Sequence, residues 1–483
     1  MRALILLHRW LGVAFCLLFA MWFASGIVMH FVPFPALTEA NRMAGLAPIA
    51  IEGAGHGPTE AVRASGLNNV SRVRLQQRGD GAVYLIADSQ RVVALHAADL
   101  SEAEVHSPQL ALSIATDYAE HRRWNAAAAA RVAALSAFDQ WTVAGNFDRH
   151  RPLYRVTLGD ARGTELYVSS TTGEAVLATT RRQRGWNYVG SVAHWLYPTA
   201  LRRHPTVWNG VVWGLSLAAL IGASAGAVIG TVRFGSGDSR FGSPYRGWQA
   251  LHHWLGLCCV LFVLTWIFSG WLSMDDGLLF STGKLTTSEI AAVAGAPDWR
   301  ALPDDELRHL GPHTVEAEWF AFNGQIYRRE RTALGTQRLA VAGSQADDAL
   351  SAREFLSSIE VDELASRLGR KCNPAFVAGS DDAYAPASVM PGAPIFRLVC
   401  GDDWFQVDAS NGTPLEKLDS SRRAYRWLFT ALHTLDFHVL VVRPALRTTL
   451  IVALCGCGFV FSLTGIVIAW RRLLTCFRSL DQR

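Results

Sequence analysis

HRWLGVAFCLLFAMWFASGIVM (residues 8–29) has a near copy in the same chain, HHWLGLCCVLFVLTWIFSGWLSM (residues 252–274). The two stretches align at an offset of 244 residues, about half of the 483-residue chain. The coinciding pairs are His8/His252, Trp10/Trp254, Leu11/Leu255, Gly12/Gly256, Trp22/Trp266, Ser25/Ser269 and Gly26/Gly270. Each stretch is apolar and has the roughly 20 residues that a membrane span needs. The sequence therefore predicts a duplicated membrane protein.

Two further apolar stretches, at about 207–232 and 446–470, bring the number of predicted membrane spans to four. Each follows a helix-like stretch that carries a histidine, His194 in the first half and His433 in the second. A proline stands where each of these spans should begin, which suits the first position of a helix. Because the two halves run in the same direction, we expect a pseudo-twofold axis along the membrane normal.

Two long polar stretches separate the spans. Both contain alternating apolar and polar residues that end in a glycine turn, as in 152–176 and 394–415, and both contain helical patterns. The predicted fold is thus a membrane α-helical protein with four transmembrane helices, a pseudo-twofold internal repeat and two α+β domains outside the membrane. The expected order is transmembrane helix 1 (1–31), first domain (32–185), interfacial helix and transmembrane helix 2 (186–233), loop (234–250), transmembrane helix 3 (251–274), second domain (275–422), interfacial helix and transmembrane helix 4 (423–471) and tail (472–483).

The distribution of charge predicts the orientation. The loop at 234–250 and the tail at 472–483 are short and basic, which is typical of the cytoplasmic side. Both termini should then be cytoplasmic, with both domains on the outer side. The formal net charge of +4 is too close to neutral to indicate a nucleic-acid partner, and we expect membrane lipid to be the surroundings of the helices. Cys372 and Cys400, the only cysteines in a polar region, could form a disulfide there.

Histidines and glycines share one face of the repeated helix. His8, Gly12, Gly26 and His30 follow helical spacing in the first copy, and His252, Gly256 and Gly270 follow it in the second. Ionisable residues within a span are costly and therefore indicate function. Imidazole is an axial ligand of haem iron, and glycines allow a flat ring to approach the backbone. We therefore predict that the chain binds haem, two molecules in all.

The repeat suggests how the histidines pair. His8 and His30 are 22 residues apart, roughly 33 Å along a helix, so they cannot share one iron. At the inner face His8 can pair with His252 or His253, and the repeat favours His252. At the outer face the repeat favours His194 with His433. The second-half counterpart of His30 is Met274, so these two either form a His/Met site or have diverged.

These motifs together resemble the PepSY-associated transmembrane family of bacterial inner-membrane proteins. The resemblance is carried by HRWLG and HHWLG, each followed by SG, by LHTLDF and RPALR before the fourth span, and by LTGIVIAWRR at its end. YVSSTTGEAV and FQVDASNGTPL are similar to the closing strands of PepSY modules. The second span departs from the family pattern, since SAGAVIGTVRF stands where the family tends to have a TG…W ending.

The resemblance implies four spans, periplasmic PepSY domains and, in its ferric-siderophore-reductase branch, b-type haems. Ligands carried over from the family are His8 with His252 (or His253), and His194 with His433. The implied activity is a haem-dependent ferric-siderophore reductase of the bacterial inner membrane. Its electron donor would be a quinol or a cytoplasmic donor, and its acceptor a ferric siderophore in the periplasm.

Two other functions are compatible with the sequence. PepSY domains on membrane anchors could bind peptides or regulate a protease or sensor, without enzymatic activity. The chain could also be an accessory of siderophore or haem uptake. Since the sequence has no GxGxxG after a strand, no P-loop and no HExxH, nucleotide-dependent enzymes and HExxH metallohydrolases have no support.

Overall fold

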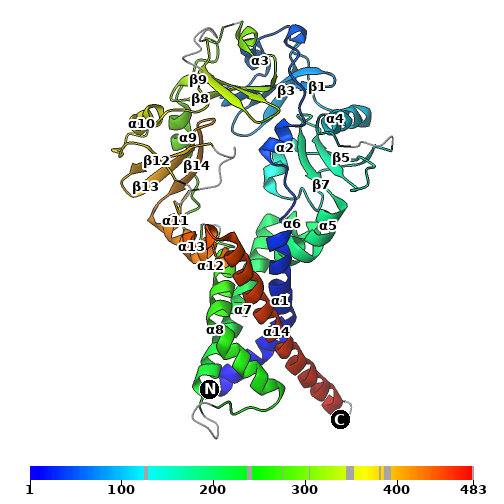
Figure 1. The fold of residues 1–483 in the computed structure, drawn as a ribbon, viewed down its shortest axis with the longest axis vertical. Coiled ribbons are helices and arrows are strands. Elements are labelled where there is room, and N and C mark those ends of the chain that lie inside the picture. The colour runs from blue at the N-terminus through cyan, green and yellow to red at the C-terminus, as the bar shows by residue number, and fades with distance from the viewer. Residues whose placement is uncertain are drawn as a thin grey trace. The chain divides into compact units, whose positions relative to one another are not determined.

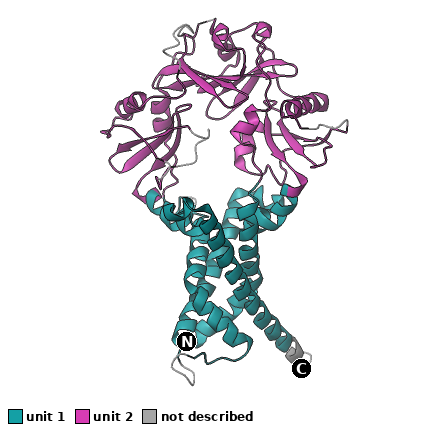
Figure 2. Cartoon of the chain, viewed as in Figure 1, with its two compact units in different colours: residues 1–34, 183–280, 423–483 teal, residues 35–182, 281–422 magenta. Residues whose placement is uncertain are grey.

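The computed structural model describes residues 1–124, 129–235, 242–275, 277–303, 305–343, 353–379, 382–385 and 393–480. Parts of the predicted loop and tail, residues 236–241 and 481–483, lie outside the described residues. The chain divides into two compact units, which Figure 2 distinguishes by colour. Unit 1 comprises residues 1–34, 183–280 and 423–483, and unit 2 comprises residues 35–182 and 281–422.

Unit 1 contains four long helices that are apolar enough to cross a membrane. They are α1 (Arg2–Phe31), α7 (Pro205–Arg233), α8 (Trp248–Leu272) and α14 (Pro444–Leu480) (Figure 1). The prediction of a membrane protein with four spans is confirmed. Helices α7 and α14 begin at Pro205 and Pro444, where the fixed φ of proline suits a first turn.

Helix α14 extends about ten residues beyond the predicted end of the fourth span, through a segment expected to be a tail. Residues 471–480, RRLLTCFRSL, contain neither glycine nor proline, and arginine and leucine are good helix formers. The helix therefore has no reason to stop where the apolar run stops.

The four helices pack in a ring in which each contacts two others. Helices α1 and α8 both pack against α7 and α14. Phe23 of α1 is buried against α14 at Gly458, where an added Cβ would lie 2.7 Å from the phenyl ring. The close approach of α1 and α14 therefore requires glycine at this position.

Unit 2 is built on three antiparallel sheets. The largest has the order β10-β9-β8-β1-β2-β3, with β1 (Arg72–Arg78), β2 (Gly81–Ala87), β3 (Val92–His96), β8 (Thr314–Phe322), β9 (Gln325–Thr332) and β10 (Gln337–Val341). One four-stranded sheet contains β4 (Arg131–Ser136), β5 (Leu153–Thr157), β6 (Glu165–Ser169) and β7 (Ala175–Thr179). The other contains β11 (Phe376–Val377), β12 (Ile395–Cys400), β13 (Asp403–Asp408) and β14 (Thr413–Leu418).

Helices complete unit 2. Helix α4 (Pro108–His121) packs on β5 and β6, and α10 (Ser358–Arg367) packs on β12. The shorter helices are α2 (Glu39–Met43), η1 (Ile51–Gly53), α3 (Pro58–Ala64), η2 (Gly145–His150), α9 (Thr287–Ala294) and η4 (Glu306–His309). The sequence predicted two separate domains, but the halves join through β1 and β8 into one six-stranded sheet. The pseudo-twofold axis stays a prediction.

The six-stranded sheet has one apolar face and one charged face, because side chains alternate along each strand. Val73, Leu75 and Trp319 belong to the apolar core. On the other face Glu316 and Glu318 stand opposite Arg331 and Arg329 in the register of β8 and β9. We call the ion-paired side chains on this side the charged layer; they are Glu39, Arg42, Arg72, Arg74, Glu174, Glu316, Glu318, Arg329 and Arg331.

Glu316 is the most connected member of the charged layer. It is fully buried and pairs with Arg331 and, at 2.7 Å, with Arg42, while Arg74 lies 3.5 Å away. Burial alone would raise the pKa of Glu316, but the three arginines outweigh it and hold that pKa well below its usual value. For Glu174 burial opposes Arg74 in the same way, and the resulting pKa is about 2.

These pKa shifts predict that unit 2 is labile to acid. A carboxyl whose pKa is lower in the folded than in the unfolded state stabilises the fold above its unfolded pKa and loses this effect as the pH falls through the folded pKa. For Glu174 the contribution is on the order of 3 kcal/mol, and it should be lost between about pH 4.5 and 2. Protection factors for hydrogen exchange in β1, β8 and β9 of the full chain should fall over that range; unchanged protection factors at pH 3 would contradict the prediction.

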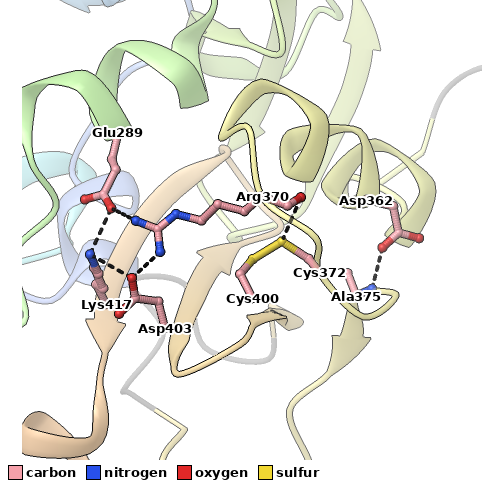
Figure 3. Close-up of a disulfide and its surroundings, with 8 residues drawn as sticks. All are labelled: Glu289, Asp362, Arg370, Cys372, Ala375, Cys400, Asp403 and Lys417. Atoms are coloured by element: carbon pink, nitrogen blue, oxygen red, sulfur yellow. Dashed lines mark hydrogen bonds and ion pairs between the residues drawn. A yellow bond between two sulfur atoms is a disulfide. The ribbon is translucent and has the colours of Figure 1, made fainter.

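A disulfide joins Cys372 to Cys400 at the end of β12 (Figure 3). Beside it Lys417 bonds to Glu289 at 2.9 Å and to Asp403 at 3.2 Å, and Arg370 contacts the same two carboxylates. The disulfide that the sequence allowed is therefore present in the structure. Such bonds persist in oxidising compartments.

Candidate functional site: two histidine pairs in unit 1

Two interfacial helices of similar construction carry His194 and His433. The first comprises α5 (Arg181–Asn187) and a π-helix, η3 (Tyr188–Val192); the second comprises α11 (Ser420–Tyr425), a π-helix, η5 (Arg426–Ala431), and α12 (Leu432–Thr434). The short helices α6 (Thr199–Arg202) and α13 (His438–Val441) follow. Turns of π-helix are rare and often occur at functional sites.

A leucine two residues beyond each histidine adopts the left-handed conformation. Leu196 has a φ of 50° and Leu435 a φ of 52°. This backbone conformation costs a residue with a Cβ roughly 1–2 kcal/mol, so the surrounding contacts must stabilise it. The same unfavourable turn therefore ends the histidine-bearing segment in both halves.

His8 and His252 face each other at the end of unit 1 where α1 and α8 begin. Their ring centres lie 6.4 Å apart. The Nδ1 of His8 lies 3.0 Å from the carbonyl oxygen of Gly222, and the Nδ1 of His252 lies 2.8 Å from the hydroxyl of Thr464. The ring of Phe461 stacks on His252 at 4.7 Å.

His194 and His433 form a second pair, toward the other end of the spans, with ring centres 6.2 Å apart. The Nδ1 of His194 lies 2.9 Å from the hydroxyl of Ser25, and the Nδ1 of His433 lies 3.1 Å from the hydroxyl of Ser269. The indole N–H of Trp22 donates to the carbonyl of His194, which fixes the backbone at this position.

The hydrogen bonds assign the proton on each ring. Thr464 donates its own hydroxyl proton to the carbonyl of Phe461, and Ser25 donates to the carbonyl of Met21. Ser269 donates to a backbone carbonyl in the same way. A hydroxyl that donates to its backbone carbonyl accepts from histidine Nδ1–H, and the Gly222 carbonyl can only accept. We assign the Nδ1–H tautomer to all four histidines, which leaves the Nε2 lone pair for a metal.

Three of the four histidines are held by a hydroxyl residue followed by glycine. Gly26 follows Ser25, Gly270 follows Ser269 and Gly465 follows Thr464. A Cβ added to these glycines would lie 3.7 Å from His194, 3.2 Å from His433 and 3.6 Å from His252. The hydroxyl thus orients the ring. A Cβ would crowd the ring at Gly270, whereas at Gly26 and Gly465 it would make ordinary van der Waals contact with the ring.

The second span lacks this pair, and His8 is held differently. At the offset of 239 residues that relates His194 to His433, Thr464 and Gly465 correspond to Ala225 and Gly226. The glycine is present in both halves, and a Cβ on Gly226 would lie only 2.4 Å from His8. Ala225 has no hydroxyl, and His8 bonds instead to the carbonyl of Gly222. The absence of a hydroxyl at residue 225 therefore changes one hydrogen-bond acceptor.

The other predicted residues have different surroundings. Both ring nitrogens of His253 are engaged, by Ser243 at 2.8 Å and by the carbonyl of Gly230 at 2.9 Å. His30 bonds through Nε2 to Thr448 on α14, and the contacts recorded among the described residues do not join it to Met274.

A cavity of about 700 Å³ lies beside His8 and His252. Helices α1, α7, α8 and α14 all contribute to its lining, and many of the lining residues are glycines. A Cβ added to Gly12 would meet no atom within 4 Å. A Cβ added to Gly256 would lie 3.3 Å from the ring of Phe461. The volume is in the range of cavities that bind cofactors.

The two pairs fit a group ligated by two imidazoles. With metal–nitrogen bonds of about 2 Å and roughly 1.1 Å from nitrogen to ring centre, two imidazoles on opposite sides of one metal have ring centres about 6.3 Å apart. The observed separations are 6.4 and 6.2 Å. Haem ligation by the four histidines stays a prediction.

Sequence reasoning missed the residues that orient the rings. Thr464, Gly222 and Gly226 received no role, and Ser25 and Ser269 were recognised only as repeated residues. The repeated SG pair and the TG of LTGIVIAWRR contained the signal, because each places a hydroxyl beside a glycine on a helix that packs close to a histidine.

Comparison with known families bears on the whole chain. A family model described as PepSY-associated TM region matches residues 5–472. The chain belongs to the PepSY-associated transmembrane family. The match covers all four spans, both interfacial helices and unit 2, so membership of the PepSY-associated transmembrane family does not rest on the helices alone. No curated protein matches the chain.

Proposed function

We propose that this protein is a haem b protein of the bacterial inner membrane that transfers electrons across the bilayer and reduces a periplasmic acceptor, a ferric siderophore. This assigns it to the ferric-siderophore-reductase branch of its family. The observation that carries the proposal is the presence of two histidine pairs, His8 with His252 and His194 with His433. In each pair the ring separation suits one metal and Nε2 is available.

Histidines of this chain would hold the two haem groups at different depths in the membrane. His8 and His252 would hold one, and His194 with His433 the other. Along α1 the two sites are separated by about 17 residues, or roughly 26 Å. When bound, haem supplies one-electron redox chemistry. His253, with both nitrogens engaged, would instead tie the end of α7 to the following loop.

Two observations support the orientation with unit 2 in the periplasm. The Cys372–Cys400 disulfide belongs to unit 2 and suits an oxidising compartment. The short connection between the second and third spans is basic, as cytoplasmic loops are. We expect a fluorescent protein fused after Arg483 to be bright and alkaline phosphatase fused there to be inactive; the reverse result would overturn the orientation.

The choice of acceptor rests on coordination chemistry and on the family resemblance. Siderophores bind iron(III) through hard oxygen ligands, and reduction to iron(II) weakens that binding. Unit 2 would bind or position the acceptor. Electrons would come from a membrane quinol or a cytoplasmic donor.

The decisive experiment is the absorption spectrum of the purified protein. Dithionite should produce sharp b-type bands, and a pyridine haemochrome assay should give two haems per chain. A protein without a chromophore, whose His→Ala variants retain biological function, would favour the alternative of a peptide-binding or regulatory PepSY protein. Retention of a siderophore without redox turnover would favour an uptake accessory.

Gly226 offers a test of the His8 position. The Gly226→Ala change should displace the His8 ring, because the new Cβ would lie 2.4 Å from it, and should lower haem occupancy of that site at least tenfold. Gly214→Ala on the same helix is the matched control, since a Cβ there meets no atom within 4 Å. Equal haem content in the two variants would contradict the assigned position of His8.

A further inference from the structure

The cavity beside His8 and His252 has one kind of charge in its lining. The charged side chains that line it are all arginines: Arg9, Arg246, Arg471 and Arg472. They come from the start of α1, the segment before α8 and the end of α14. No aspartate or glutamate belongs to the described lining, so this part of the cavity is strongly electropositive.

The arginines occupy one end of an otherwise apolar space. Arg9 directly follows His8, and Arg471 and Arg472 stand beyond Ile468 on α14. The lining farther along α1 consists of residues such as Phe15 and Phe19. All four arginines are exposed, and the ion pairs recorded among the described residues involve none of them. The cavity is thus cationic at one end and mostly apolar along the rest of its length.

We propose that this arginine-lined end binds the two carboxylates of the haem, and so sets the direction in which the tetrapyrrole enters the site. The inference rests on the proposed function. Haem has an apolar edge and an edge with two carboxylates, which matches the division of the cavity. Guanidinium groups bind carboxylates through paired, charge-assisted hydrogen bonds that a neutral side chain cannot replace.

The same chemistry would suit another anion. The phosphate of an anionic phospholipid could occupy the arginines from the surrounding bilayer, and basic residues at this face also follow the general charge asymmetry of membrane proteins. The two sources differ in one respect: only the haem carboxylates are covalently part of the molecule that the histidines ligate.

The experiment exploits this difference. The double variant Arg471→Gln/Arg472→Gln and the wild type are stripped of haem in detergent and titrated with haem and with haem dimethyl ester, which lacks free carboxylates. Soret absorbance gives each Kd. Arg2→Gln is the matched control, because Arg2 lies near the same end of α1 but does not line the cavity.

We expect the double variant to bind haem about tenfold more weakly than the wild type, and both proteins to bind the ester equally. Equal loss for haem and ester, or no loss for either, would overturn the inference while leaving the histidine sites intact. Loss of co-purifying anionic phospholipid with unchanged haem affinity would assign the arginines to lipid. Failure of the wild type to bind either porphyrin would instead refute the proposed function.

Discussion

Replacing His252 with alanine should remove about half of the haem that purifies with the protein, from two equivalents per chain to one. The reason is geometric: the ring of His252 stands 6.4 Å from that of His8, and its Nδ1 is occupied by Thr464, so that Nε2 is the nitrogen left for iron. His8→Ala should have the same effect. A pyridine haemochrome assay measures the stoichiometry, and low-temperature electron paramagnetic resonance distinguishes the remaining low-spin site.

The neighbouring histidine is the control. His253→Asn should keep both haems, because both ring nitrogens of His253 are already engaged by Ser243 and Gly230. Size-exclusion chromatography in detergent establishes that each variant is folded. If His253→Asn loses a haem and His252→Ala does not, the inner pair is His8 with His253, and the assignment made from the hydrogen bonds is wrong.

Glu316→Gln should lower the free energy of unfolding of unit 2 by about 3–5 kcal/mol. Glu316 is fully buried between Arg331 and Arg42, with Arg74 nearby. Glutamine keeps the shape of the side chain but removes its charge, so the arginines would remain buried without the anion that balances them. Hydrogen exchange of β8 and β9 in the full-length protein reports the change without requiring unit 2 to fold alone.

Glu120→Gln makes the comparison specific. Glu120 lies on α4 in the same unit and is exposed, and the same change there should alter stability by less than about 0.5 kcal/mol. Similar exchange rates in the two variants would show that the charged layer contributes nothing beyond an ordinary surface charge. The acid lability predicted above would then need another origin.

The helices were the most predictable part of the molecule. Long apolar runs need no tertiary information, and Pro205 and Pro444 marked two helix starts because proline at that position has a local physical reason. The end of α14 was not predictable in the same way, since the apolar run ends at the membrane boundary while helix propensity continues through Arg471 and Arg472.

The sequence did not predict that the two halves of the chain join in one sheet of unit 2. The hairpin formed by β2 and β3 is a local pattern, whereas the pairing of β1 with β8 depends on residues about 240 positions apart. The charged layer was missed for a related reason. Alternating charges such as Glu316 and Glu318 resemble a solvated strand face until a second layer is known to cover them.

For the candidate site, the repeat singled out the two histidine pairs that the structure brings ring to ring. The sequence left His252 and His253 as alternatives, and the hydrogen bonds that separate them involve Thr464 and Gly230, which lie elsewhere in the chain. The absorption spectrum of the purified protein tests whether these histidines bind haem iron.

The pairing of β1 with β8 has a consequence for biosynthesis. At about 5–20 residues per second, on the order of 10 to 50 seconds pass between synthesis of the two strands. During that interval β1 is an unpaired edge of the kind that recruits strands from other chains. A product truncated between the halves should therefore aggregate instead of surviving as a half-sized protein.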